Sequence, residues 1–441
     1  MPSERDSACA VLFFCGFFMI NLGEKTGVYL DTMRNLQPGT NGVACSDSIA
    51  KVKTQFISEF VDKETGEILQ CVEGKNGALK KAVDPVEIRL ERWILQSSVK
   101  HLLPKKRVDK CLSVRAHGQD EIKVLHNSKR KTAHYGGLQT CGSVWDCPIC
   151  AVKISERRRV DEVLPAMERW VDQGGIDGQG GQCLLLTLTH PHSNTDVLKD
   201  LLKGEQKAMS SMTGSRAYRK LLESAGCIGT IRAWEVTHGD NGFHPHFHLI
   251  LFVRTFDRPF FDDYALQDLK EGLYRAWANA CRLAKLSIPD RKGFDLQDGS
   301  HAHNYVSKGV WGLDHEITKG HLKKAKKGRS PMDLVRSYAF EQDKQAGALF
   351  IEYSNAFHGK SQLYWSPGLK DYFKINEKTD EQIAAEQDDQ ANELGQIDWP
   401  TWLLVLKFKM RGEIIELGRL GSWDAILRLL ADLKKIEVKN E

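Results

Sequence analysis

The feature that most constrains the fold is a run of histidines at alternate positions, His244-Pro-His246-Phe-His248. Alternate residues of a strand share one face, so the three imidazoles are expected together, with Phe247 pointing into a core on the other side. A second run of strand length covers residues 229–237, and the sequence HGDNG between the two runs is typical of a tight turn. The pattern predicts a β-hairpin with one face of imidazoles.

The flanking sequence indicates what the hairpin joins. The apolar run Cys183–Thr189 has the length of a strand, while residues 195–222 and 262–285 have the spacing of helices. The order strand, helix, strand, strand, helix predicts an α+β fold. We expect a central, mostly antiparallel sheet with flanking helices.

Aligned imidazoles suit a divalent metal ion, because unpaired imidazoles are costly to bury. A hard cation also needs oxygen ligands, and Glu235 on the partner strand is the obvious source. The predicted set is His246, His248 and Glu235, leaving open positions for a phosphate oxygen. His238 and His244 are rival third ligands. The alternative is a surface patch of histidines.

A second chemical signal is Tyr305-Val-Ser-Lys308. On a helix, positions i and i+3 lie on one face, so Lys308 would lie beside the Tyr305 hydroxyl and favour the phenolate. Tyrosine is an accepted covalent nucleophile. On its own, a tyrosine is more often a packing residue.

A third signal is the cysteine cluster Cys141-x5-Cys147-Pro-Ile-Cys150. The CPxC spacing predicts a zinc site, and eleven cysteines without a disulfide-like distribution favour a reducing, cytoplasmic compartment. We expect Cys111 as the fourth ligand, with His117, His126 and His134 as alternatives. Unligated cysteines are the competing interpretation.

The charge distribution suggests a polyanionic partner. The net charge is only +4, but residues 101–374 alone carry a net +10. The predicted DNA-contacting residues are Arg157, Arg158, Lys323, Lys324, Lys326 and Lys327. A solvated charged face is the alternative for each run.

The remaining segments contain no further catalytic or metal-binding motif. Residues 8–22 form an apolar stretch shorter than the ~20 residues needed to span a membrane, so we expect a buried segment or an upstream extension and no membrane partner. The predicted organisation is listed in chain order: a poorly defined N-terminal region at 1–100, a Cys-rich, zinc-like, DNA-binding region at 101–180, an α+β domain with the histidines and Tyr305 at 181–374, an acidic linker at 375–398 and a small C-terminal module at 399–441.

The ordered motifs resemble those of a known family. CGSVWDCPICAVKISERR, LLLTLT, EVT with GFHPHFHLI, NYVSKG and GKSQLYWSPGLK occur in the order found in rolling-circle plasmid replication initiators of the HUH endonuclease superfamily. The resemblance runs from about Cys111 to Lys370. The ordered set is far more specific than any one motif.

The resemblance implies a nickase and religase. His246 and His248 would be the HUH metal ligands, with Glu235 or a neighbour completing a Mg²⁺ or Mn²⁺ site. Tyr305 would attack the scissile phosphate, giving a 5′-phosphotyrosine and a free 3′-hydroxyl primer. The implied partners are plasmid origin DNA, a host helicase and a host DNA polymerase. The cysteines would hold a structural Zn²⁺.

One position departs from the family. Some members carry a Glu four residues before the nucleophilic tyrosine, where this chain has His301. The residue that acts at termination could be Asp298 or His301, or a second protomer in a homo-oligomer could supply another tyrosine.

Three alternative functions remain open. The alternating histidines also resemble the histidine-triad nucleotide hydrolases, although Pro245 fits that pattern poorly and the cysteines would have no use. A non-catalytic, zinc-dependent DNA-binding regulator would leave the histidines structural. A mobilisation relaxase or transposase would share the nicking chemistry and differ in biological role.

Overall fold

The computed structural model describes residues 59–61, 68–70, 85–171, 181–254, 263–298 and 328–440. Residues 8–22, Tyr305, Lys308, His301 and the lysines at 323–327 lie outside the described residues. Within them the chain is α+β with antiparallel sheets, as predicted. No described helix combines the length and apolarity that crossing a membrane requires.

The central sheet has five strands in the order β8-β5-β7-β6-β9, and every pairing is antiparallel. The strands are β5 (Gly181–Leu188), β6 (Gly229–Gly239), β7 (Gly242–Arg254), β8 (Phe294–Asp298) and β9 (Leu363–Trp365). The predicted hairpin is confirmed: β6 and β7 pair along their length and close on the two residues Asp240 and Asn241.

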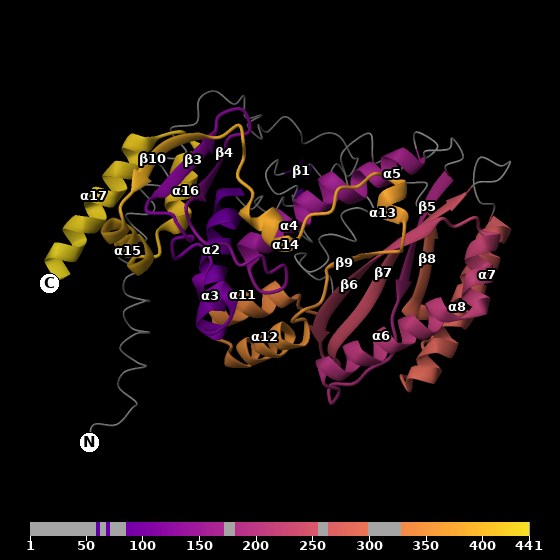
Figure 1. Cartoon of the computed structure of the whole chain (residues 1–441). Coiled ribbons are helices and arrows are strands. Elements are labelled where there is room, and N and C mark those ends of the chain that lie inside the picture. The colour runs from indigo at the N-terminus through magenta and orange to yellow at the C-terminus, as the bar shows by residue number, and fades with distance from the viewer. Residues whose placement is uncertain are drawn as a thin grey trace, which may run out of the picture.

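Helices cover the two faces of this sheet differently (Figure 1). One face packs on helices that contribute residues such as Met209 and Trp277 to its core. These helices are α6 (Leu198–Gly214), α7 (Arg216–Ser224) and α8 (Asp263–Ala284). The other face carries α5 (Leu164–Val171) and α13 (Leu369–Tyr372), which pack on Phe252 and its neighbours at one end of the strands.

A second unit lies to the left of the sheet in Figure 1 and combines the early and late parts of the chain. Its three-stranded sheet has the order β10-β3-β4, with β3 (Ile122–Asn127), β4 (Thr132–Gly136) and β10 (Asn392–Ile397). Its helices are α2 (Pro85–Leu102), α3 (Arg107–Lys110), α4 (Pro148–Arg158), α11 (Pro331–Glu341), α12 (Lys344–Ala356), α14 (Asp380–Ala385), α15 (Trp399–Lys407), α16 (Arg411–Arg419) and α17 (Trp423–Asn440). A π-helical turn, η2 (Arg159–Val163), joins α4 to α5.

Three short elements complete the described structure. They are the hairpin strands β1 (Glu59–Val61) and β2 (Ile68–Gln70) and the 3-10 turn η3 (Arg291–Gly293).

The predicted linker at 375–398 is wrong. This segment holds α14 and β10, and β10 pairs with β3 from Ile397↔Ile122 to Asn392↔His126. The acidic side chains that suggested a solvated linker instead pair with cations elsewhere, as Glu393 does with Lys123 at 2.9 Å. Residues 399–441 share one hydrophobic core with the Cys-rich region, so they are not a separate module.

Candidate metal centres and catalytic face

The register of the hairpin brings the predicted metal ligands together. Glu235 lies directly opposite His246, and His248 is two residues further along β7 on the same face. Glu235 Oε2 is 3.0 Å from His248 Nε2 and 3.7 Å from His246 Nε2. The three ligand atoms are mutually within 4.8 Å, which is close enough for one ion.

The electrostatic environment of this group favours an ionised carboxylate at Glu235, beside the two imidazoles. Burial alone would raise the pKa of Glu235, but its hydrogen bonds to His246 and His248 hold that pKa far below its usual range. Burial opposes the charged form of His246, yet the same carboxylate raises the pKa of His246. His246 and His248 are only 8% and 7% exposed, so little water competes for their nitrogens.

Thr187 is a site residue that sequence reasoning missed. It lies on β5 opposite His248, and its hydroxyl is 3.1 Å from His248 Nδ1. A partner on Nδ1 fixes the ring so that Nε2 faces the shared site. The sequence does indicate this residue, because Thr187 is a polar side chain inside the otherwise apolar run Cys183–Thr189.

His192 is a second missed residue. Its Nδ1 lies 2.9 Å from the Asn241 carbonyl, which can only accept, so this nitrogen carries the proton. His192 Nε2 must then accept from His244 Nδ1, 2.7 Å away. Burial, and then the neighbouring His246, lower the pKa of His244 to about 3, so His244 is neutral at pH 7. His244, the rival third ligand, thus uses its Nδ1 in a hydrogen bond to His192.

The other predicted site residues are placed only in part. His238 sits near the hairpin turn and bridges Arg329 through the backbone, outside the Glu235 group. Asp298 ends β8, and Tyr305 follows in the part of the chain that is not described. Asp295, earlier in β8, lies opposite Thr187 and therefore on the same side of the sheet as the histidines, and its carboxylate pairs with Lys270 at 2.8 Å.

The four predicted cysteines converge in the second unit. Sγ of Cys111 lies 3.6 Å from Cys150 and 3.8 Å from Cys147, and Cys141 lies 3.6 Å from Cys150. Four thiolates around zinc at 2.3 Å with tetrahedral angles have sulfurs about 3.8 Å apart, whereas a disulfide needs about 2 Å. The donor set and spacing therefore fit Zn²⁺. The alternatives His126 and His134 lie on β3 and β4, and His117 is an exposed loop residue; none of the three joins the group.

The surroundings of the cysteines also suit a thiolate centre. Burial opposes ionisation of Cys147, but hydrogen bonds from the other three thiols lower its pKa well below the usual value. Gln96 Nε2 donates to Cys147 Sγ at 3.3 Å, and Arg411 donates to Gln96 Oε1 at 2.7 Å. Lys100 donates to the Cys111 carbonyl at 2.6 Å. One buried cation, Arg411, and one half-buried cation, Lys100, thus lie near a group that zinc binding would leave with a net negative charge. Sequence reasoning gave no signal for Gln96, Lys100 or Arg411.

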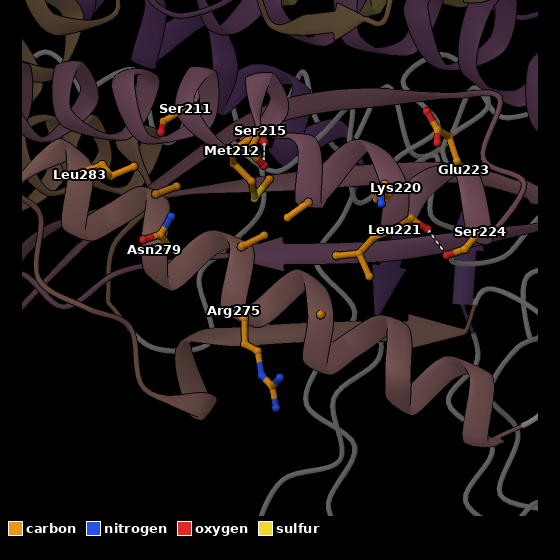
Figure 2. A pocket seen from close by; sticks show the side chains of 14 residues that line it. Ser211, Met212, Ser215, Lys220, Leu221, Glu223, Ser224, Arg275, Asn279 and Leu283 are labelled. Atoms are coloured by element: carbon orange, nitrogen blue, oxygen red, sulfur yellow. Dashed lines mark hydrogen bonds between the residues drawn. The ribbon is translucent and has the colours of Figure 1, made fainter.

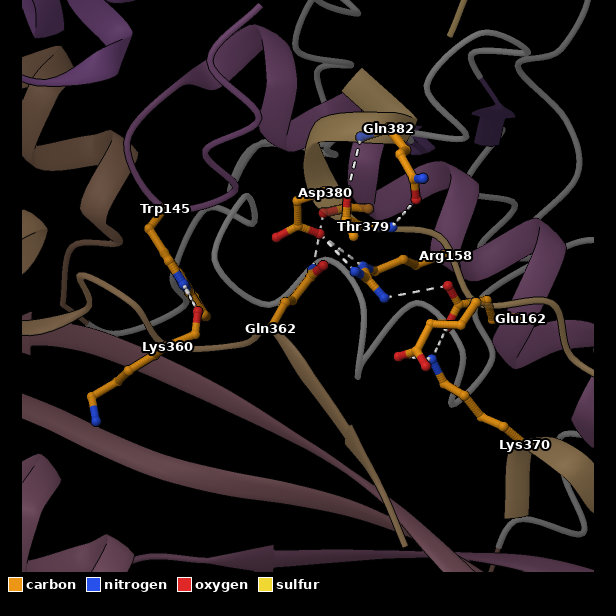
Figure 3. A network of polar contacts seen from close by, with 11 residues as sticks. Trp145, Arg158, Glu162, Lys360, Gln362, Lys370, Thr379, Asp380 and Gln382 are labelled. Carbon is orange, nitrogen blue, oxygen red and sulfur yellow. Dashed lines mark hydrogen bonds and ion pairs between the residues drawn. The ribbon is translucent and has the colours of Figure 1, made fainter. Parts of the chain in front are cut away.

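The arginines predicted to contact DNA form ion pairs within the protein, and Figure 3 shows those of Arg158. Arg158 is 2.7 Å from Asp380 and 3.3 Å from Glu162, which also faces Lys370 at 3.5 Å. Arg157 lies 3.7 Å from Asp161. These contacts tie α4 to α14 and to α13, and they leave less of this charge for phosphate.

The pocket drawn in Figure 2 lies away from both centres. It is a groove of about 850 Å³ between α6, α7 and α8, lined by residues such as Met212, Leu221 and Arg275. These helices cover the face opposite the histidines. The groove contains none of the predicted site residues.

Comparison with known proteins gives the following matches. Residues 137–411 match the model of a family described as "Replication protein". "Protein rep" of Streptomyces lividans is 27% identical over 296 residues, which is 53% of this chain and 63% of that protein. A "Neomycin resistance protein" of Streptomyces cyanogenus is 33% identical over 142 residues, 26% of this chain and 31% of that protein. The chain therefore spans less than two thirds of either relative. No solved structure matches.

Proposed function

The chain belongs to this family of replication proteins, and on that premise we propose that it initiates plasmid replication by nicking one strand of origin DNA. Membership confirms the family resemblance drawn from the order of the motifs. The observation that carries the nicking proposal is the convergence of Glu235, His246 and His248 on one sheet face.

In the proposed site, Glu235, His246 and His248 hold a Mg²⁺ or Mn²⁺ ion. The bound ion would polarise the scissile phosphate and neutralise its charge. Thr187 keeps the His248 ring oriented, and the low exposure of both histidines limits competition by water. The mixed carboxylate and imidazole donors suit Mn²⁺ as well as Mg²⁺.

Tyr305 is the proposed nucleophile. Its oxygen attacks phosphorus, the bond from phosphorus to the 3′-oxygen breaks, and the tyrosine proton passes by way of solvent to the departing oxygen. The products are a 5′-phosphotyrosine and a 3′-hydroxyl primer. Lys308 would favour the phenolate. Termination would use Asp298, His301 or a second tyrosine.

The reach of the chain supports this assignment. Tyr305 lies seven residues beyond Asp298, a span of at most about 25 Å. β8 and β7 are separated only by β5, so they lie about 10 Å apart across the sheet. Asp298 lies opposite Leu184, three positions along β5 from Thr187, which adds about 10 Å along the strands. The span is therefore long enough for Tyr305 to reach the level of His248.

The cysteine group is proposed as a structural Zn²⁺ centre. The four thiols come from the loop after α3, from residues 141–147 and from the start of α4, and zinc would hold these segments together. The proposed partner of the whole chain is origin DNA. A host helicase and a host polymerase follow from the resemblance.

A nicking assay tests the proposal. Full-length protein with Mg²⁺ or Mn²⁺ is mixed with 3′-labelled single-stranded oligonucleotides tiled across the plasmid origin. We expect a labelled adduct that survives SDS, requires metal and disappears in Tyr305→Phe. Binding of origin DNA without any adduct would favour the non-catalytic regulator. Nucleotide hydrolysis that persists in Tyr305→Phe would favour a histidine-triad enzyme.

A further inference from the structure

The segment Gly359–Lys370 contributes an exposed tyrosine to the edge of the central sheet. Tyr364 of β9 pairs with Arg232 of β6, and the guanidinium carbon of Arg232 lies 4.7 Å from the centre of the tyrosine ring. Tyr364 is 49% exposed, so one face of its ring is held by a cation while much of the side chain meets solvent. Beyond β9, the described structure adds no further strand to the sheet.

A second ring and cation lie beside this pair. Trp234 is two residues from Arg232 on β6 and therefore on the same face. Lys360 Nζ lies 5.7 Å from the centre of the Trp234 ring. The Lys360 carbonyl accepts a hydrogen bond from Trp145 Nε1 at 2.7 Å, while its side chain points away from the Arg158 network in Figure 3. The backbone that carries this lysine is thus fixed.

The charge of this patch is uncompensated. Within the described part of the chain, neither Arg232 nor Lys360 forms an ion pair with a carboxylate, in contrast to Arg158. Burial lowers the pKa of both cations, and the groups that oppose this effect at Arg232 are two tyrosines. Cations over aromatic rings without acidic partners attract a polyanion that also presents flat rings.

We propose that Arg232, Trp234, Lys360 and Tyr364 form a platform that binds single-stranded DNA. Tyr364 would stack on a base through the face of its ring that is not covered by Arg232, and Lys360 would face a phosphate. Arg232, whose guanidinium carbon lies 5.1 Å from the Phe247 ring and 4.7 Å from the Tyr364 ring, would hold the tyrosine in place and add positive charge beneath it. Duplex DNA fits poorly, because its bases are already stacked on one another. The inference relies on the proposed function only for the choice of DNA as the nucleic acid.

The position of the platform suits DNA that leaves the nicking face. Trp234 and Glu235 are neighbours on β6, so their side chains lie on opposite faces of the same strand. β9 is only three residues long and forms the edge on this side. A single strand passing from the histidine face could therefore turn around β9 and reach Tyr364.

The test measures binding of fluorescein-labelled oligo(dT) and of a duplex by anisotropy, with full-length protein in EDTA. We expect Tyr364→Ala to weaken oligo(dT) binding about 10-fold, in the range that one stacked base supplies, and Tyr364→Phe to bind like wild type. Lys360→Gln should reduce the slope of log K against log salt by about 0.7. Duplex binding should not change. Phe340→Ala, an equally exposed aromatic at 47% on α11, is the matched control.

Oligo(dT) affinity that is unchanged in both Tyr364→Ala and Lys360→Gln would overturn the platform. An equal loss of oligo(dT) and duplex binding would also overturn it, because it would indicate a general charge effect. Since EDTA prevents metal-dependent cleavage, these measurements do not depend on nicking. Failure of the adduct assay would remove the proposed catalytic function and leave the platform standing.

Discussion

Glu235 and His246 face each other across β6 and β7, with 3.7 Å between the carboxylate oxygen and Nε2. The same oxygen lies 3.0 Å from His248. One carboxylate thus serves two imidazoles: without metal it is hydrogen-bonded to His248 and lies within ion-pair distance of His246. In the proposed site, a bound ion would lie between the carboxylate and the imidazoles and replace their direct contact. Metal affinity should therefore depend on the charge of Glu235.

Glu235→Gln should weaken Mn²⁺ binding by at least about 10-fold, because the amide keeps the shape and loses the charge. Isothermal titration of the full chain with Mn²⁺ measures this. Glu271→Gln is the matched control, since Glu271 is an exposed carboxylate paired with Arg275 and Arg291 on the other side of the sheet. Equal affinity in Glu235→Gln and wild type would exclude Glu235 as a ligand.

Thr187→Val should lower Mn²⁺ affinity by about 10- to 100-fold while preserving the fold, because valine keeps the volume and loses the bond to His248 Nδ1. Thr187→Ser should restore most of the affinity. Circular dichroism and the Mn²⁺ titration together separate positioning from folding. If the serine variant binds as weakly as the valine variant, the hydroxyl is not what orients His248.

The zinc assignment predicts about one Zn²⁺ per chain by elemental analysis. Cys111→Ser should lose this zinc and lower the midpoint of thermal unfolding, because the cysteines lie in the core of the second unit. Cys227→Ser is the control, since Cys227 lies outside the cluster and its thiol bonds the Gly229 carbonyl. Full zinc content in Cys111→Ser would rule out Cys111 as a ligand.

Glu413 in α16 should make stability depend on pH. Burial raises the pKa of Glu413 to about 7 from an ordinary 4.5. Between these values the native state holds a proton that the unfolded chain has released, so this group lowers stability as pH rises. Each pKa unit corresponds to about 1.4 kcal/mol. Glu413→Gln should therefore stabilise by up to about 3 kcal/mol at pH 8.5 and by much less at pH 5.

Denaturant unfolding at the two pH values measures this difference. Glu437→Gln gives the comparison, because Glu437 on α17 is a half-buried carboxylate that already has a cationic partner, Lys407. An equal gain at both pH values would show that the gain arises from packing and not from ionisation.

The hairpin and the convergence of Glu235, His246 and His248 could be predicted because their signals are local. Alternation at His244, His246 and His248 fixes which side chains share a face, and the short turn places Glu235 opposite them. The cysteine spacing was equally local, and Cys111 followed from the need for a fourth thiolate. The second unit could not be predicted in the same way. β10 pairs with β3 across more than 260 residues, and its acidic composition suggested solvent exposure.

Contacts made by uncharged side chains, or between residues far apart in the sequence, could not be predicted either. Gln96 has no pattern around it that indicates a thiol partner, and its role depends on Arg411 from the far end of the chain. The arginines at 157 and 158 show the opposite case, a charge run whose internal partners the sequence did not indicate. Their run suggested phosphate contact, but α14 supplies Asp380 as an internal partner for Arg158.

The link from Cys147 through Gln96 to Arg411 has a consequence during translation. Gln96 and Arg411 are 315 positions apart, so the nascent chain presents its thiols long before the helix that encloses them leaves the ribosome. Strands β5 to β8 fall within residues 181–298 and can assemble in that interval. If the cysteines bind zinc as proposed, capture of the metal would compete with their oxidation until synthesis is nearly complete.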